Sequence, residues 1–156
     1  EQISLYEAFL QRLSQYEELE SIGDAWSDME EKLKSFYNEE NYEKTHRAFM
    51  EAQKENEYQY EHLMVYYTFR YFMRAFYDNN LLEKAQFAAA SFLMVRDMDV
   101  MVWMKNGQKF DLQDRIGTTK VYAKEVEHSE ENIEMLGESF LFEDVFSVKG
   151  LLAQIM

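Results

Sequence analysis

The sequence predicts an all-α fold: an orthogonal or irregular bundle of about seven to eight helices around a central aromatic-rich helical hairpin. The chain of 156 residues has no proline and only five glycines, so it lacks the turn residues that β-sandwiches and barrels require. Its 47% hydrophobic and 29% charged residues are typical of a folded chain. Apolar residues also recur at helical spacing. The length fits one domain, and we predict a single helical domain over residues 1–156.

The first predicted helix covers about residues 3–19, because its apolar residues share one helical face. These residues are Leu5, Phe9, Leu13, Tyr16 and Leu19. We expect Gly23 to serve as the C-cap of this helix. Asp24 can accept hydrogen bonds from exposed amides, so we expect it to cap a second helix that ends near Tyr37.

A third, mostly polar helix is expected after Asn38 or Asn41, on the outside of the bundle. Residues 58–77 follow it, and nine of these twenty residues are aromatic. This composition predicts a helix that is buried on most of its sides. A turn at 78–80 and a long helix over about 81–104 complete the predicted hairpin.

Polar residues mark the ends of the remaining helices. We expect the long helix to close at residues 106–107, where asparagine precedes glycine. Asp111 or Asp114 can cap the next helix, Ser129 can restart or continue it, and Ser147 can open a last short helix. The sequence therefore predicts helices to the end of the chain.

The charge of the chain limits its partners. Sixteen Lys and Arg against thirty Asp and Glu give a net charge of −14. Binding to nucleic acid or to an anionic membrane surface is disfavoured, because both depend on basic side chains. No segment is long and apolar enough to span a bilayer. The absence of cysteine fits a reducing, cytoplasmic location. The charge is uneven: −10 over residues 1–61, +3 over 62–124 and −7 over 125–156.

Few catalytic motifs are present. The chain has no cysteine nucleophile, no Gly-x-Ser-x-Gly elbow and no glycine-rich phosphate loop. Glu43/His46 and Glu125/His128 each have the Glu-x-x-His spacing of a di-iron four-helix bundle. However, the residues around Glu43 and His46 are polar, and the aromatic segment supplies no further inward glutamates. We predict no metal site.

Two groups of residues are candidates for binding or catalysis. Arginine and tyrosine side chains on one face of residues 58–77 could bind a substrate or an anion. These are Tyr67, Arg70, Tyr71 and Arg74. Such arginines can instead pair with acids on neighbouring helices. Glu125 or His128 could act as a general base, and the alternative is a solvated acidic turn between helices.

Residues 56–136 resemble the C-terminal helical region of the flagellin lysine-N-methylase family. The resemblance depends on three stretches in order: EHLMVYYTFRYFMRAFYDNN, AQFAAASFLMVRDM and VYAKEVEHSEENIEML. The family core of Tyr-Tyr-x-x-Arg-Tyr type corresponds to Tyr66, Tyr67, Arg70 and Tyr71. Its Glu-His-Ser/Asn helix corresponds to Glu125, Glu127, His128, Ser129, Glu130 and Asn132.

This resemblance implies a bacterial enzyme that transfers methyl groups from S-adenosylmethionine to lysine side chains of flagellin or another lysine-bearing protein. The cysteine-rich region expected near the family's N-terminus, with its metal cluster, has no counterpart here. The chain would then be the C-terminal part of a longer protein, with a substrate-docking or accessory role. It could also contribute Tyr67, Arg70, Glu125 and His128 to one wall of an active site. The alternative function is a non-catalytic acidic helical protein-interaction module, and the oligomeric state stays open.

Overall fold

The computed structural model describes residues 3–155, and this part of the chain contains helices and no strand. The predicted all-α class is therefore confirmed. The helices are α1 (Leu5–Glu17), α2 (Asp24–Phe36), α3 (Tyr42–Ala52), α4 (Tyr58–Phe72), α5 (Ala75–Asp78), α6 (Leu81–Lys105), α7 (Leu112–Tyr122), α8 (Glu130–Phe142) and α9 (Val148–Ile155). None of these helices is long and apolar enough to cross a membrane.

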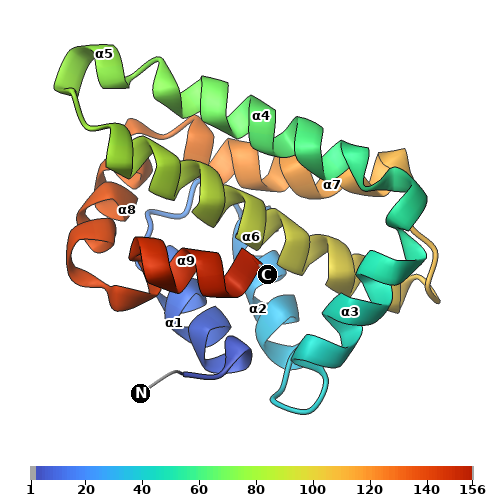
Figure 1. Cartoon of the computed structure of the whole chain (residues 1–156). Coiled ribbons are helices and arrows are strands. Elements are labelled where there is room, and N and C mark those ends of the chain that lie inside the picture. The colour runs from blue at the N-terminus through green and yellow to red at the C-terminus, as the bar shows by residue number, and fades with distance from the viewer. Residues whose placement is uncertain (1–2, 156) are drawn as a thin grey trace.

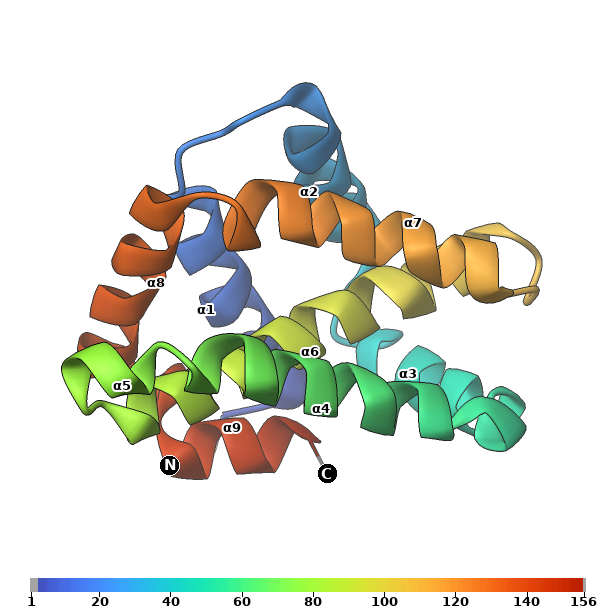
Figure 2. The same cartoon turned by 90° about the horizontal axis from the view of Figure 1, so that it is seen from above.

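Helix α6 forms the centre of the molecule and crosses it from one end to the other, with the other helices around it (Figures 1 and 2). Most of its side chains are buried, including the small residues Ala88, Ala89 and Ala90. These allow neighbouring helices to approach closely. After the single turn α5, helix α6 returns alongside α4, so the predicted hairpin is confirmed.

Several predicted helix ends are confirmed by their hydrogen bonds. Asp111 and Asp114 form a reciprocal capping box at the start of α7. The side chain of Ser129 accepts a hydrogen bond from the Asn132 amide at 3.1 Å. Helix α6 ends before Gly107, whose φ of 66° lies in the left-handed region that glycine adopts without strain.

The connection between α1 and α2 differs from the prediction. Helix α1 already ends at Glu17, and Gly23 is extended at the N-cap of α2 rather than at the C-cap of α1. Asp24 is the first residue of α2 and provides no side-chain cap. The reason is tertiary: the amides of Glu20 and Ile22 each donate, at 2.9 Å, to a side-chain oxygen of the segment around α8. These bonds hold the connection extended.

Helix α3 is mostly polar and lies on the outside of the bundle, as predicted, but one of its sides is buried (Figure 1). Tyr42, His46 and Phe49 are all buried on the side of α3 that faces α6. The outer side of α3 is charged, and its inner side carries only these few large residues. An average over the whole segment therefore hides its amphipathic character.

The prediction that the aromatic segment is buried on most sides was wrong. Tyr60, Leu63, Tyr67 and Tyr71 face the core, whereas many of the other large apolar side chains on α4 and α5 are exposed. Helix α4 lies at the edge of the bundle, so other helices cover only one of its sides (Figure 1).

Candidate functional site

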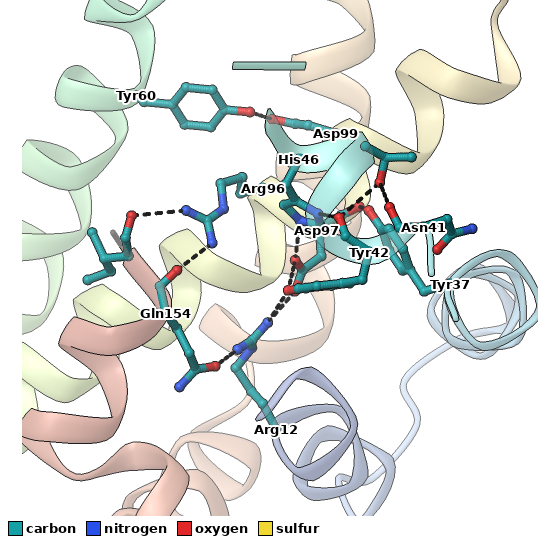
Figure 3. Close-up of polar contacts among 12 residues, drawn as sticks. Arg12, Tyr37, Asn41, Tyr42, His46, Tyr60, Arg96, Asp97, Asp99 and Gln154 are labelled. Atoms are coloured by element: carbon teal, nitrogen blue, oxygen red, sulfur yellow. Dashed lines mark hydrogen bonds and ion pairs between the residues drawn. The ribbon is translucent and has the colours of Figure 1, made fainter. Parts of the chain in front are cut away.

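A buried carboxylate in the middle of α6, Asp97, organises the first candidate site (Figure 3). Its Oδ1 atom accepts hydrogen bonds from the Tyr42 hydroxyl and from His46 Nε2, each at 2.8 Å. Its Oδ2 atom accepts from the fully buried guanidinium of Arg12. The hydroxyl of Tyr37 donates to the Asp97 backbone carbonyl at 2.6 Å. Helices α1, α3 and α6 and the residue that follows α2 thus meet at Asp97.

The environment of Asp97 favours its charged form. Burial alone would raise the pKa of Asp97, but the charge of Arg12 and the hydrogen bond from His46 outweigh burial and lower the pKa to about 2. His46 Nδ1 lies 2.7 Å from the Tyr42 carbonyl oxygen. Both ring nitrogens of His46 therefore have hydrogen-bond partners within the domain.

A cavity of about 440 Å³ lies beside this network. Its walls are mostly long charged or polar side chains of both signs, from α3, the turn after it, α6 and α9. Among them are Glu43, Arg47, Glu51, Lys54, Arg96 and Gln154. The guanidinium of Arg96 donates to the backbone carbonyl of Gln154 at 2.8 Å, and this hydrogen bond links α6 to α9 at the cavity wall (Figure 3).

A second buried carboxylate, Asp99, lies two residues further along α6. It accepts hydrogen bonds from the Tyr60 hydroxyl at 2.8 Å and from Thr118 Oγ1 at 2.5 Å. The guanidinium of Arg115 lies 3.6 Å from Asp99 and 3.9 Å from the centre of the Tyr60 ring. Burial nevertheless dominates and raises the pKa of Asp99 to about 6. This cluster joins α4, α6 and α7.

The arginines predicted to bind an anion instead face acids of the same chain. Arg70 donates to the backbone carbonyl of Glu127 at 3.1 Å, and its Nε lies 3.7 Å from the Glu127 carboxylate. The Tyr66 hydroxyl donates to that carboxylate at 3.1 Å. Arg74 forms an ion pair with Glu130. These contacts hold α4 against the segment that joins α7 and α8.

The other predicted site residues do not gather in one cleft. Tyr67 and Tyr71 are buried in the core. The Glu125 carboxylate is buried and accepts the amide hydrogen of Ile22, whereas His128 is exposed. Residues Ala123–Glu127 form a π-helical turn, in which Glu125 accepts from the Ile22 amide and Glu127 from the Tyr66 hydroxyl. The roles proposed for these residues in binding and catalysis stay predictions.

A comparison with known protein families decides the affiliation of the chain. The model of the FliB lysine N-methylase C-terminal domain matches residues 1–154. The chain belongs to this family. The resemblance seen over residues 56–136 is thereby confirmed, and it extends to almost the whole chain. No match is found among the curated proteins or among the solved structures.

The Glu-x-x-His pairs of this FliB C-terminal domain do not form a shared site. His46 contacts Asp97, and Glu125 contacts the Ile22 amide, as described above. Within residues 3–155, no group of three or more His, Cys, Asp or Glu side chains is placed to hold a metal ion.

Two cavities of the FliB C-terminal domain lack an exposed tyrosine, phenylalanine or tryptophan ring. The cavity beside His46 has charged walls, and the ring of Tyr42 in its lining is buried. The second, of about 780 Å³ between the start of α1 and α9, has no aromatic lining residue. Neither offers an exposed ring on which an adenine base could stack.

Sequence reasoning missed the two buried carboxylate clusters. Asp97 and Asp99, together with Arg96, are charged residues within the otherwise apolar stretch FLMVRDMDVMVW, which was the available signal. Arg12 gave a similar signal, since it lies between Phe9 and Tyr16 on the apolar face of α1. Which partners these charges meet could not be read from the sequence, because the partners lie far away along the chain.

Proposed function

We propose that this chain is an accessory, substrate-docking domain of a lysine N-methylase, and that its partner is flagellin or another lysine-bearing protein. The family match carries the proposal that the enzyme acts on lysine. The net charge of −14 supports a partner that presents lysines, because complementary charge steers encounter and fixes orientation.

An acidic surface on α8 and the segment that follows α1 is the proposed contact for these lysines. Glu131, Glu134 and Glu138 are exposed along one side of α8, and Glu20 lies next to them. The neighbouring side chain of Glu20 raises the pKa of Glu131, first through a shared hydrogen bond and then through its like charge. Carboxylates this close repel one another, and a lysine ammonium would relieve that repulsion.

The contacts of the candidate catalytic residues support an accessory role. Glu125 is buried on the Ile22 amide, and Arg70 is held by Glu127. Neither side chain lines the cavity beside His46 or the cavity between α1 and α9. We therefore propose that S-adenosylmethionine and the methyl-transfer step belong to the remaining part of the enzyme.

Steady-state methylation of flagellin by a lysine N-methylase that carries this domain tests the proposal. The variant Glu134→Gln/Glu138→Gln removes two charges from the α8 surface. We expect KM for flagellin to rise several-fold with little change in kcat, and the difference to shrink at high salt. Glu39→Gln/Glu40→Gln is the matched control, since it removes two exposed charges between α2 and α3. Equal effects of the two variants would argue against docking on α8.

A non-catalytic acidic interaction module is the alternative function. It is favoured by one observation: Tyr67, Arg70, Glu125 and His128 do not line a common cavity. Mass spectrometry of flagellin, incubated with S-adenosylmethionine and the enzyme, separates the two functions. If no methyl groups are added, the interaction module replaces the methylase domain.

A further inference from the structure

The outer side of α4, with the turn after it and α5, is an exposed apolar surface. Phe69 is 68% exposed, Phe76 77% and Tyr77 92%. We call this surface the α4–α5 apolar face, and it consists of Val65, Phe69, Phe72, Met73, Phe76 and Tyr77. Figure 2 looks onto the helices that carry it.

The α4–α5 apolar face is larger than the apolar patches that monomeric proteins normally expose. With about 200 Å² for each fully exposed aromatic side chain, its four aromatic residues alone expose on the order of 500 Å², and the whole face roughly 700 Å². The largest apolar patch on a typical monomer is about 300–600 Å². One side of a standard protein interface buries about 800 Å².

The spacing of these residues shows what kind of element fits them. Val65, Phe69 and Phe72 on α4 are separated by four and three positions, which is the spacing of a helix-packing seam. Phe76 follows on α5, beyond the turn. The inner seam of α4, which includes Tyr67 and Tyr71, already packs on the core. Helix α4 thus has two apolar sides, of which this domain covers one.

The charged residues near the face limit the kind of partner that it can bind. Between Glu61 and Asp78 the only Lys, Arg, Asp or Glu residues are Arg70 and Arg74, and both contact acids of the segment after α7. The α4–α5 apolar face therefore presents neither carboxylates for a lysine-rich substrate nor cations for an acidic one. Large, uncharged and aromatic surfaces are typical of permanent contacts, whereas transient ones are more polar.

We propose that the α4–α5 apolar face is covered by the remaining part of the lysine N-methylase, through a helix with a complementary apolar stripe. The family is that of a C-terminal domain, so the enzyme has a further part. Its permanent attachment would bury this face. The inference relies on the proposed function for the existence of that part, but not on docking at the acidic α8 surface.

Hydroxyl-radical footprinting with mass spectrometry tests this inference. We compare the isolated 156-residue chain, at a concentration where sedimentation shows a monomer, with a lysine N-methylase that carries it. Oxidation of Phe69, Met73 and Phe76 is expected to fall at least several-fold in the enzyme. Leu152, which is 54% exposed on α9, is the internal control and should be oxidised equally in both.

Two results would overturn the inference. The first is equal oxidation of the face in the isolated chain and in the enzyme. The second is an isolated chain that sediments as a dimer with the face protected, which would assign the face to a second copy. Flagellin methylation is measured separately on the same enzyme. If the enzyme methylates flagellin but the α4–α5 apolar face is not protected, this inference alone is refuted. If the face is protected but flagellin is not methylated, the proposed function alone is refuted.

A pair of variants provides a second readout. Phe69→Asp places a charge on the face, and Leu152→Asp makes the same kind of change on α9. Both should leave the circular dichroism of the isolated chain unchanged, because both side chains are exposed. In the enzyme, Phe69→Asp is expected to increase protease cleavage between the domain and the remaining part several-fold, and Leu152→Asp is not. Equal cleavage of both variants would contradict the proposed contact.

Discussion

Asp97 and Asp99 lie two residues apart on α6 and are both fully buried, yet their environments shift their pKa values in opposite directions. Asp97 accepts hydrogen bonds from Arg12, Tyr42 and His46, which stabilise its charge. Asp99 has neutral donors, and its one nearby cation, Arg115, lies 3.6 Å away. The folded state therefore favours the charged form of Asp97 and the neutral form of Asp99.

Removal of the Asp97 charge should strongly destabilise the domain. In Asp97→Asn the buried guanidinium of Arg12 loses its counter-ion, and the free energy of unfolding should fall by about 3–5 kcal/mol. Urea denaturation measures the loss. Asp28→Asn is the control, because its ion pair with Lys32 is exposed and should contribute less than about 1 kcal/mol. Similar losses in the two variants would contradict a special role of Asp97.

Asp99 should make stability fall as the pH rises. Its folded pKa of about 6 exceeds the unfolded value of about 3.9. The stabilising contribution of the bound proton is therefore complete below pH of about 4 and disappears as the pH rises through about 6, with a total of roughly 3 kcal/mol.

Asp99→Asn checks this pH dependence, because the amide cannot ionise. The difference in unfolding free energy between the wild type and Asp99→Asn should change by most of that amount between pH 4 and pH 7. Urea denaturation at a series of pH values gives the difference. A difference that stays constant with pH would show that Asp99 does not titrate in this range.

Two glycines should respond to alanine with opposite signs. A Cβ at Gly150 would lie 2.5 Å from the Asp144 carbonyl oxygen and 2.8 Å from that of Val145. Gly150→Ala should therefore cost about 1–3 kcal/mol. Gly117 lies within α7 with nothing within 4 Å of an added Cβ, so Gly117→Ala should stabilise by about 0.5–1 kcal/mol. Thermal unfolding followed by circular dichroism measures both, and a stabilised Gly150→Ala would contradict the packing of α9.

The hydroxyl groups of Tyr67 and Tyr60 should contribute differently to the stability of the fold. The buried Tyr67 hydroxyl has no hydrogen-bond partner in the described residues, so Tyr67→Phe should be neutral or slightly stabilising. The Tyr60 hydroxyl donates to Asp99, and Tyr60→Phe should cost about 1–3 kcal/mol. Urea denaturation compares the two.

The same Tyr67→Phe variant also tests the predicted binding role of this residue. A higher KM for flagellin at unchanged stability would support that role. An unchanged KM would leave Tyr67 as a core residue.

Local rules predicted much of this fold. Asp111 and Ser129 cap helices as expected, since capping depends on residues three positions apart. The hairpin of α4 and α6 was also predictable, because its segments are long, strongly apolar and joined by a short turn. The α1–α2 connection was not, because the amide of Ile22 binds Glu125, which lies 103 residues away.

The candidate site was less predictable than the fold. The sequence identified Arg70 and Arg74 as side chains that need a partner, and it left open an external anion or an acid of the chain. Only the tertiary structure places Glu127 and Glu130 beside them. The catalytic and binding roles of the predicted residues await the experiments above.

The sequence by itself determined the helical class, many helix ends and the family resemblance, because these depend on residue types within a few positions or within one stretch. Only the tertiary structure decided which side of α4 is covered and which charges meet Asp97 and Asp99. Arg12 lies 85 residues from Asp97 along the chain, and a burial pattern of this range is created by packing alone. Burial weakens solvent screening, so it is the folded surroundings that set the charge of each carboxylate.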